Sequence, residues 1–204
     1  MDFIVTAYYS QGTIYEQEVK RLINSLKEFE LPYFVKPVPR FSTWYEGVQY
    51  KPTFIQEMLQ QFAPASIVYV DVDAEFLQYP TLFHKLNARS DVDLAAHVLD
   101  HSHRSRRNRA PELLSGTLFF KNNETSAFIV SEWIKKCTNA GQLWDQKALW
   151  EVISSTPFYV LPEEYCTIFD YMADVKEPVI RHYQASRKTR NGINTPQYIP
   201  DKTC

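Results

Sequence analysis

The chain has 204 residues, of which 45% are hydrophobic and 15% aromatic, so we expect one globular domain covering residues 1–204. Its 24 acidic and 22 basic side chains give a formal net charge of −2, which predicts no overall attraction to polyanions. No run of about 18 apolar residues occurs, and the N-terminus lacks the basic and apolar segments of an export signal, so stable membrane insertion is not expected.

Short apolar runs alternate with stretches of helical periodicity along the chain. Strands are predicted at 3–8, 33–38, 66–70, 94–99 and 116–120, with shorter ones near 158–161 and 179–181. Helices are predicted at 19–26, 52–62, 81–86, 124–137 and 145–153, with Pro52 in the first turn of the second. This alternation predicts an α/β layer architecture with a mainly parallel sheet. Roughly the last ten residues should form a loose tail.

Cys137, Cys166 and Cys204 are widely spaced and odd in number. They fit neither a paired disulfide framework nor a zinc-finger spacing. The simplest expectation is a soluble protein of the reducing cytoplasm.

Two carboxylates, Asp71 and Asp73, directly follow the apolar run 67–70. They should emerge at the carboxyl end of a central strand, the edge at which open α/β sheets bind ligands. Such a pair can hold Mn²⁺ or Mg²⁺ and leave coordination positions for diphosphate oxygens, although two solvated acids in a turn are the alternative. A second pair, Asp91 and Asp93, precedes its strand and is assigned a structural role.

Three further side chains could join this site. His182 follows the apolar pair 179–180, and its neutral imidazole could complete a metal shell. Lys188 stands six residues later and could bind a phosphate. Lys51 precedes Pro52 at the expected start of a helix, where the helix dipole disfavours a cation, and this position suggests phosphate binding. Each of the three could equally have no ligand.

Asp145 and Gln146 begin a predicted helix, where an aspartate commonly caps or complements the dipole. In a sugar-transfer site they could instead stabilise an oxocarbenium-like centre or orient an acceptor. Gly116, after Ser115 in a strand, permits close approach of a ligand or of a packed neighbour. With five glycines, the chain has neither Gly-x-Gly-x-x-Gly nor a Walker loop, which disfavours nicotinamide dehydrogenases and P-loop kinases.

In their order, these motifs resemble the retaining GT-A glycosyltransferases, most closely the family 8 group of glycogenin and galactosyltransferase-like enzymes. The resemblance implies a single-domain GT-A fold and transfer, with retention, from a nucleotide-sugar, preferably a UDP-sugar, to an acceptor hydroxyl. It assigns Mn²⁺ or Mg²⁺ to Asp71, Asp73 and His182, and catalytic roles on the sugar side to Asp145 and Gln146. The implied donor-binding residues are Thr6, Tyr8, Tyr9, Lys51, Asp71 and Lys188, with a tyrosine on the base and the lysines on the diphosphate.

Three positions depart from the family pattern. Ala185 replaces its glycine, Ser115 its usual asparagine, and Lys147 the second aspartate after Asp-Gln. The chain is also short for the family, which leaves little room for a separate acceptor domain.

Cationic side chains gather in segment 101–109 and again at Arg181, Arg187, Lys188 and Arg190. The first segment lies where GT-A enzymes often carry an acceptor loop. A saccharide and a polyanion such as modified DNA are comparable as acceptors, and the loop could also be a lid over the diphosphate. The predicted acceptor-binding residues are Arg104, Arg106, Arg107, Arg109, Ser115 and Gly116.

Two other classes of protein stay open. A nucleotidyltransferase would share a related sheet, but no Gly-rich, Arg-containing loop follows the first strand. A non-catalytic nucleic-acid-binding module would use the basic loop, but it leaves Asp71, Asp73 and His182 without a role. The oligomeric state is not predicted.

Overall fold

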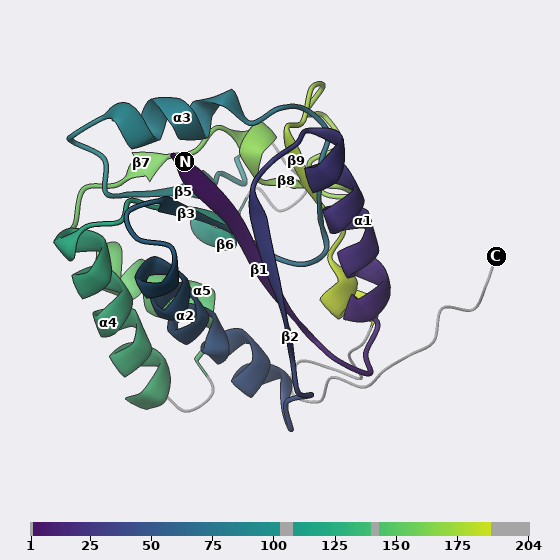
Figure 1. The fold of residues 1–204 in the computed structure, drawn as a ribbon, viewed down its shortest axis with the longest axis horizontal. Helices are drawn as coiled ribbons and strands as arrows, with labels where there is room; N and C mark the ends of the chain where they lie inside the picture. Colours follow the sequence, from purple (N-terminus) through teal and green to yellow (C-terminus); the bar gives the residue numbers. More distant parts are fainter. Residues whose placement is uncertain (1, 103–107, 140–142, 189–204) are drawn as a thin grey trace.

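A computed structural model describes residues 2–102, 108–139 and 143–188 (Figure 1). The strands are β1 (Phe3–Ser10), β2 (Tyr33–Val38), β3 (Ser66–Val70), β4 (Ala74–Phe76), β5 (Leu94–Leu99), β6 (Glu112–Phe120), β7 (Tyr159–Val160), β8 (Thr167–Ile168) and β9 (Ile180–His182). The helices are α1 (Tyr15–Glu28), α2 (Trp44–Gln61), α3 (Thr81–Ala88), α4 (Glu124–Asn139) and α5 (Asp145–Ile153), with 3₁₀ turns η1 (Glu163–Tyr165) and η2 (Ala185–Lys188).

The larger of two sheets has six strands in the order β2-β1-β3-β6-β5-β7. Strand β1 is parallel to β2 and β3, and β5 is parallel to β7, whereas β6 is antiparallel to both of its neighbours. All strands except β6 therefore share one direction, which agrees with the predicted mainly parallel sheet. Because β6 is reversed, Thr117 lies opposite Val70 at the carboxyl end of β3, and the residues of β6 before Thr117 extend past that end.

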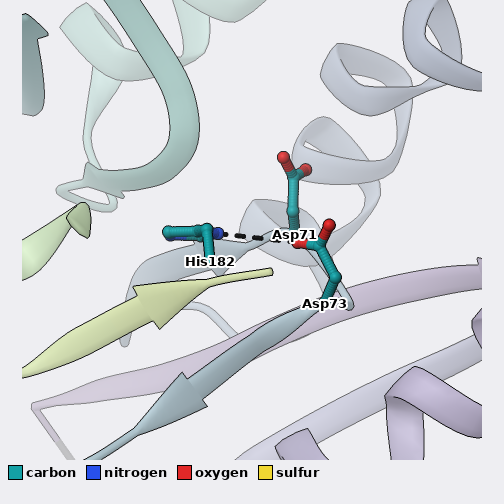
Figure 2. Close-up of side chains that lie close together, drawn as sticks. All are labelled: Asp71, Asp73 and His182. Atoms are coloured by element: carbon teal, nitrogen blue, oxygen red, sulfur yellow. Dashed lines mark ion pairs between the residues drawn. The ribbon is translucent and has the colours of Figure 1, made fainter. Parts of the chain in front are cut away.

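A smaller sheet, β4-β9-β8, adjoins this same edge. Strand β4 begins directly after Asp73, and β9 runs antiparallel to it, with His182 opposite Ala74. The pairing brings a histidine from near the end of the described chain beside two aspartates that follow β3 (Figure 2). Strands β4 and β8 were not predicted, because segments of three and two residues are too short to show a period.

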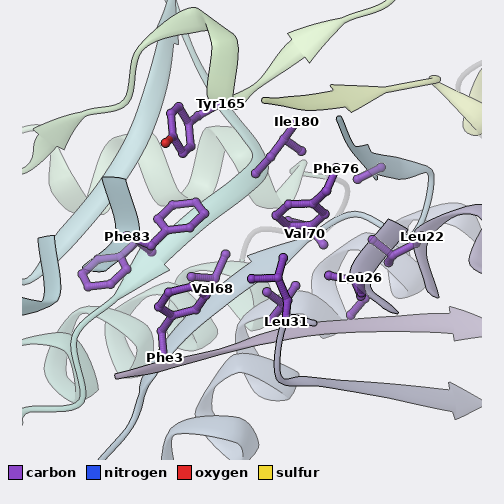
Figure 3. Close-up of a cluster of buried hydrophobic side chains, with 14 of the residues drawn as sticks. Phe3, Leu22, Leu26, Leu31, Val68, Val70, Phe76, Phe83, Tyr165 and Ile180 are labelled. Atoms are coloured by element: carbon purple, nitrogen blue, oxygen red, sulfur yellow. The ribbon is translucent and has the colours of Figure 1, made fainter. Parts of the chain in front are cut away.

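Helices cover both faces of the large sheet. Successive side chains of a strand point to opposite faces, so Val68 and Val70 pack with α1 and α3, including Leu22 and Phe83 (Figure 3). On the other face, Tyr69 and its alternate neighbours pack with α2, α4 and α5. Over the described residues, no helix combines the length and the apolar character needed to cross a membrane.

Helix α2 begins earlier than the sequence analysis predicted. Thr43 and Glu46 form a capping box, in which the Glu46 N–H donates to Thr43 Oγ1 (3.1 Å) and the Thr43 N–H donates to the Glu46 carboxylate (3.3 Å). Pro52 therefore lies inside the helix and not in its first turn. The prediction that Lys51 stands at a helix N-terminus was wrong, and the reason given for phosphate binding there no longer holds.

Candidate active site

Asp71, Asp73 and His182 come together where the two sheets meet (Figure 2). One potential ligand atom from each lies within 4.8 Å of the others. Asp71 follows β3, Asp73 precedes β4, and His182 ends β9. The structure thus assembles the three side chains that the sequence analysis selected as metal ligands, whereas their binding of a metal stays a prediction.

Both carboxylates are held from outside the cluster. The Tyr69 hydroxyl donates to Asp71 Oδ1 (2.9 Å), and the backbone N–H of Ala185 donates to Asp73 Oδ2 (2.7 Å). Burial, together with the Asp71 carboxylate, keeps the pKa of Tyr69 well above its ordinary value, so its hydroxyl keeps the proton that it donates. The alanine in place of the family's glycine still supplies the N–H that orients Asp73.

His182 presents one ring nitrogen to the cluster. Its Nε2 lies 2.8 Å from Thr117 Oγ1, whereas the buried Nδ1 has no hydrogen-bond partner among the described residues and lies 3.7 Å from Asp73 Oδ1. Burial lowers the pKa of His182, but the neighbouring Cys166 and Asp73 raise it more, to about 10. A bound cation would take the place of that proton.

Gly116 gives the cluster its space. A Cβ at this position would lie 3.1 Å from His182 Cε1 and 3.4 Å from Asp71 Oδ2. The Gly116 carbonyl also accepts a hydrogen bond from the Asp71 N–H (2.8 Å). The close approach predicted at this glycine is therefore made by two side chains of the cluster.

Lys51 links this cluster to Asp145. Its Nζ lies 3.0 Å from Asp71 Oδ1 and 2.9 Å from Asp145 Oδ2, and it donates to Ser115 Oγ (3.0 Å). The lysine is only 3% exposed. Burial lowers its pKa, but Asp145 and Asp71 raise it more, so the net pKa is above the ordinary value. Lys51 is thus a buried cation between two carboxylates.

Asp145, the second carboxylate partner of this lysine, and Gln146 are the first two residues of α5. Asp145 is buried and accepts from Ser115 Oγ (2.7 Å), so its carboxylate does not cap α5. The Gln146 carbonyl oxygen accepts from the Ser115 N–H at 3.4 Å. Ser115 connects the acid, the amide and the lysine, whereas its predicted contact with an acceptor stays a prediction.

These groups line a cleft of about 280 Å³. Tyr8 and Tyr9, at the end of β1, also line it, and so do Trp44 and Trp144. The Tyr8 hydroxyl donates to the Gly47 carbonyl (2.7 Å). An acidic cluster, a buried ion pair and aromatic walls therefore share one cavity.

Residues 42–193 match the sequence profile described as nucleotide-diphospho-sugar transferase, which covers more than half of the chain. The chain belongs to the nucleotide-diphospho-sugar transferase family. It is a glycosyltransferase with a nucleotide-sugar donor. This identification removes the nucleotidyltransferase and the non-catalytic binding module as alternatives.

Solved structures show the same fold. A glycosyltransferase involved in the glycosylation of the major capsid of PBCV-1 is similar with a TM-score of 0.72 and 15% identity, over 92% of this chain and 96% of that one. The galactosyltransferase LgtC, in complex with donor and acceptor sugar analogs, is similar with a TM-score of 0.58 and 11% identity, over 89% and 87%.

The apo form of the glycosyltransferase GlyE of Streptococcus pneumoniae is similar with a TM-score of 0.65 and 14% identity, and this chain spans 57% of its length. No curated protein sequence matches. At these identities the similarity shows the GT-A fold alone.

Thr6 does not lie where its predicted role in donor binding requires. This residue is fully buried within β1 and does not line the cleft, so the structure gives it no direct access to a donor. The predicted role of Thr6 in donor binding is therefore corrected.

The basic residues are described only in part. Arg104, Arg106, Arg107 and Arg190 lie outside the described residues, and Arg109 is exposed shortly before β6. Lys188 ends η2, close in sequence to Ala185. Arg187 forms an ion pair with Asp170.

Sequence reasoning missed Tyr69 and Thr117, which orient two of the cluster side chains. Tyr69 stands two residues before Asp71. Residues at this spacing in a strand lie on the same face of the sheet, so the sequence could have predicted their contact. Thr117 gave no such signal, because its partner His182 is 65 residues away and is positioned by a three-residue strand.

Proposed function

We propose that this glycosyltransferase is metal-dependent, with Mn²⁺ or Mg²⁺ held by Asp71, Asp73 and His182 beside the diphosphate of a UDP-sugar. The observation that carries the proposal is the buried His182 Nδ1, which has no hydrogen-bond partner among the described residues and faces Asp73 Oδ1. Carboxylate oxygens with one imidazole suit these cations. When bound, the cation supplies a Lewis acid that stabilises the departing diphosphate.

The surrounding residues hold the ligand atoms in place. Tyr69 and Lys51 both bond Asp71 Oδ1, which leaves Asp71 Oδ2 on the side of Gly116 and the imidazole. The Ala185 N–H fixes Asp73 in the same manner. Such outer contacts orient metal ligands and commonly change metal affinity by about 10- to 100-fold.

Donor recognition is the second part of the proposal. Tyr8 or Tyr9 contacts the base, and Lys51 and Lys188 contact the diphosphate. Both tyrosines line the cleft that holds the acidic cluster, which supports the first assignment. Lys51 Nζ already meets two carboxylates and Ser115, so its contact with a phosphate requires the exchange of one of these partners.

Asp145 and Gln146 line the sugar side, where a carboxylate and a carboxamide stabilise an oxocarbenium-like centre and orient the acceptor hydroxyl. The hydrogen bonds from Ser115 to both side chains support this assignment, because they fix the two groups toward one cavity. Transfer retains the anomeric configuration, as the resemblance to family 8 implies, and an NMR spectrum of the first product formed tests it.

The free thiols of Cys137 and Cys166 fit a reducing cytoplasm.

The proposal is tested by thermal unfolding with a panel of UDP-, GDP- and ADP-sugars, each with and without Mn²⁺. A ligand that binds the native state raises its melting temperature. We expect a rise with a UDP-sugar that requires the metal, and its loss in Asp73→Asn. Asp91→Asn is the matched control, because Asp91 belongs to the second acidic pair and bonds to Arg89 in an exposed turn.

A rise that is independent of Mn²⁺ would contradict the metal site. An equal response of wild type and Asp73→Asn would also contradict it. No rise with any nucleotide-sugar would remove the support for the donor assignment.

A further inference from the structure

Two tryptophans from distant parts of the chain meet at the cleft. Trp44 is the first residue of α2, and Trp144 directly precedes Asp145 and α5. Their ring centroids lie 5.3 Å apart, with an angle of 79° between the ring planes. Both are half-buried and line the cleft, so part of each indole is accessible from it.

Contacts between α2 and the start of α5 fix this pair. The Trp144 Nε1–H donates to the Tyr45 hydroxyl (3.4 Å), and the Gln49 amide donates to the Leu143 carbonyl (2.9 Å). Lys147 Nζ lies 5.8 Å from the centroid of the Trp144 ring. The indoles are therefore held in position before any ligand arrives, which lowers the entropy cost of stacking a ligand on them.

The described residues that line the cleft carry few free cations. Among the described lining residues, Arg40 and Lys51 are the lysine and arginine side chains, and Lys51 is already paired with Asp71 and Asp145. Asp73 adds a further acid. Affinity for nucleic acid depends on cations that meet several phosphates, and the described residues of this wall supply one unpaired cation at most.

A neutral sugar matches the same wall. A pyranose ring has a face of C–H groups and a rim of hydroxyls, and the face of an indole is electronegative and attracts C–H groups. Polar groups for the rim lie close in sequence to each tryptophan, with Ser42 and Thr43 before Trp44 and Gln146 after Trp144, and all of them line the cleft. Aromatic walls with a few polar groups are typical of small-ligand sites.

We propose that Trp44 and Trp144 form a stacking wall that binds the pyranose ring of a saccharide acceptor next to Asp145. This inference rests on the proposed function and narrows its acceptor from a saccharide or modified DNA to a saccharide. Trp44 and Trp144 bind the acceptor and set its specificity, whereas the donor is held by the acidic cluster and the residues at the end of β1.

The test is a titration of intrinsic tryptophan fluorescence with maltose, lactose and cellobiose in the wild type, Trp44→Ala, Trp144→Ala and Trp150→Ala. Trp150 is the matched control, because it is an exposed indole on α5 that packs on Phe158 and does not line the cleft. We expect at least one disaccharide to bind, with affinity about tenfold lower in both cleft variants and unchanged in Trp150→Ala. Trp44→Phe should restore part of the loss.

Donor binding is measured separately as the melting shift with UDP-sugar and Mn²⁺, which Trp44→Ala should keep. Loss of that shift would mean that the wall holds the nucleobase, and it would overturn the proposal. No response to any of the three disaccharides would also overturn it, as would binding of a hydroxymethylated DNA duplex that depends on Trp44. Saccharide binding without any donor shift in the wild type would instead contradict the proposed function.

Discussion

Gly116 lies against the imidazole of His182, because a Cβ at this glycine would be 3.1 Å from His182 Cε1. A contact at this distance is tighter than ordinary packing, and Thr117 Oγ1 also holds the imidazole, at 2.8 Å from Nε2. The approach of β6 to the cluster of Asp71, Asp73 and His182 therefore depends on the absence of one methyl group.

Replacing this glycine by alanine should displace His182 and weaken the cluster. We expect Gly116→Ala to lose most of the Mn²⁺-dependent melting shift and to lower the free energy of unfolding by about 1–3 kcal/mol, since overpacking a closed site costs this much. Gly47→Ala is the control. Gly47 lies inside α2, and a Cβ there would meet Phe41 at an ordinary distance of 3.4 Å. Alanine also stabilises a helix relative to glycine by up to about 1 kcal/mol. Equal Mn²⁺ responses of Gly116→Ala and wild type would contradict the arrangement.

The buried position of Lys51 predicts a large cost for removing its charge. Lys51→Met leaves two carboxylates unpaired, and we expect the free energy of unfolding to fall by about 3 kcal/mol or more in urea titrations. Lys36→Met provides the comparison, because Lys36 pairs with Glu57 near the surface and should cost no more than about 1 kcal/mol. Similar costs for the two variants would mean that Lys51 does not compensate Asp71 and Asp145.

Thr117 and Thr6 are both buried, but the hydroxyl of Thr117 contacts His182 whereas that of Thr6 has no hydrogen-bond partner among the described residues. Thr117→Val removes the partner of His182 Nε2, so we expect Mn²⁺ affinity, measured by calorimetry, to fall about 10-fold or more with the fold retained. Thr6→Val removes a buried hydroxyl that has no hydrogen-bond partner among the described residues, and it should leave Mn²⁺ and donor binding unchanged and raise the unfolding free energy slightly. A loss of donor binding in Thr6→Val would support the sequence-based role of Thr6 against the structure.

Burial should keep Cys137 unreactive. Burial, and to a smaller extent the Asp145 carboxylate, raise the pKa of this thiol to about 12. The thiol therefore stays protonated in the folded state as pH rises through the range where an unfolded thiol ionises, and this difference destabilises the fold at high pH. We expect iodoacetamide near pH 9 to modify Cys137 only after urea is added, as read by peptide mass spectrometry. Rapid labelling of the native protein would contradict this.

Much of the sheet edge was predictable from sequence, because the run 67–70 ends in Asp71 and the parallel strands carry long apolar patterns. The surroundings of Lys51 were not predictable. Its helix begins seven residues earlier, at Trp44, and its partner Asp145 lies 94 positions later in the chain. Local patterns select residue types for a site, but pairings over such separations follow from the packing of α2 against β3 and α5, and of α5 against β6.

The reversal of β6 also determines where this enzyme can change without losing its fold. Strand β5 ends at Leu99 and β6 begins at Glu112, on the edge of the sheet that carries the cleft. Both ends of the connection between them lie at this edge, so its length and composition can vary while every strand keeps its register. Divergence in this connection would therefore come at little expense to the strands that carry the cleft residues.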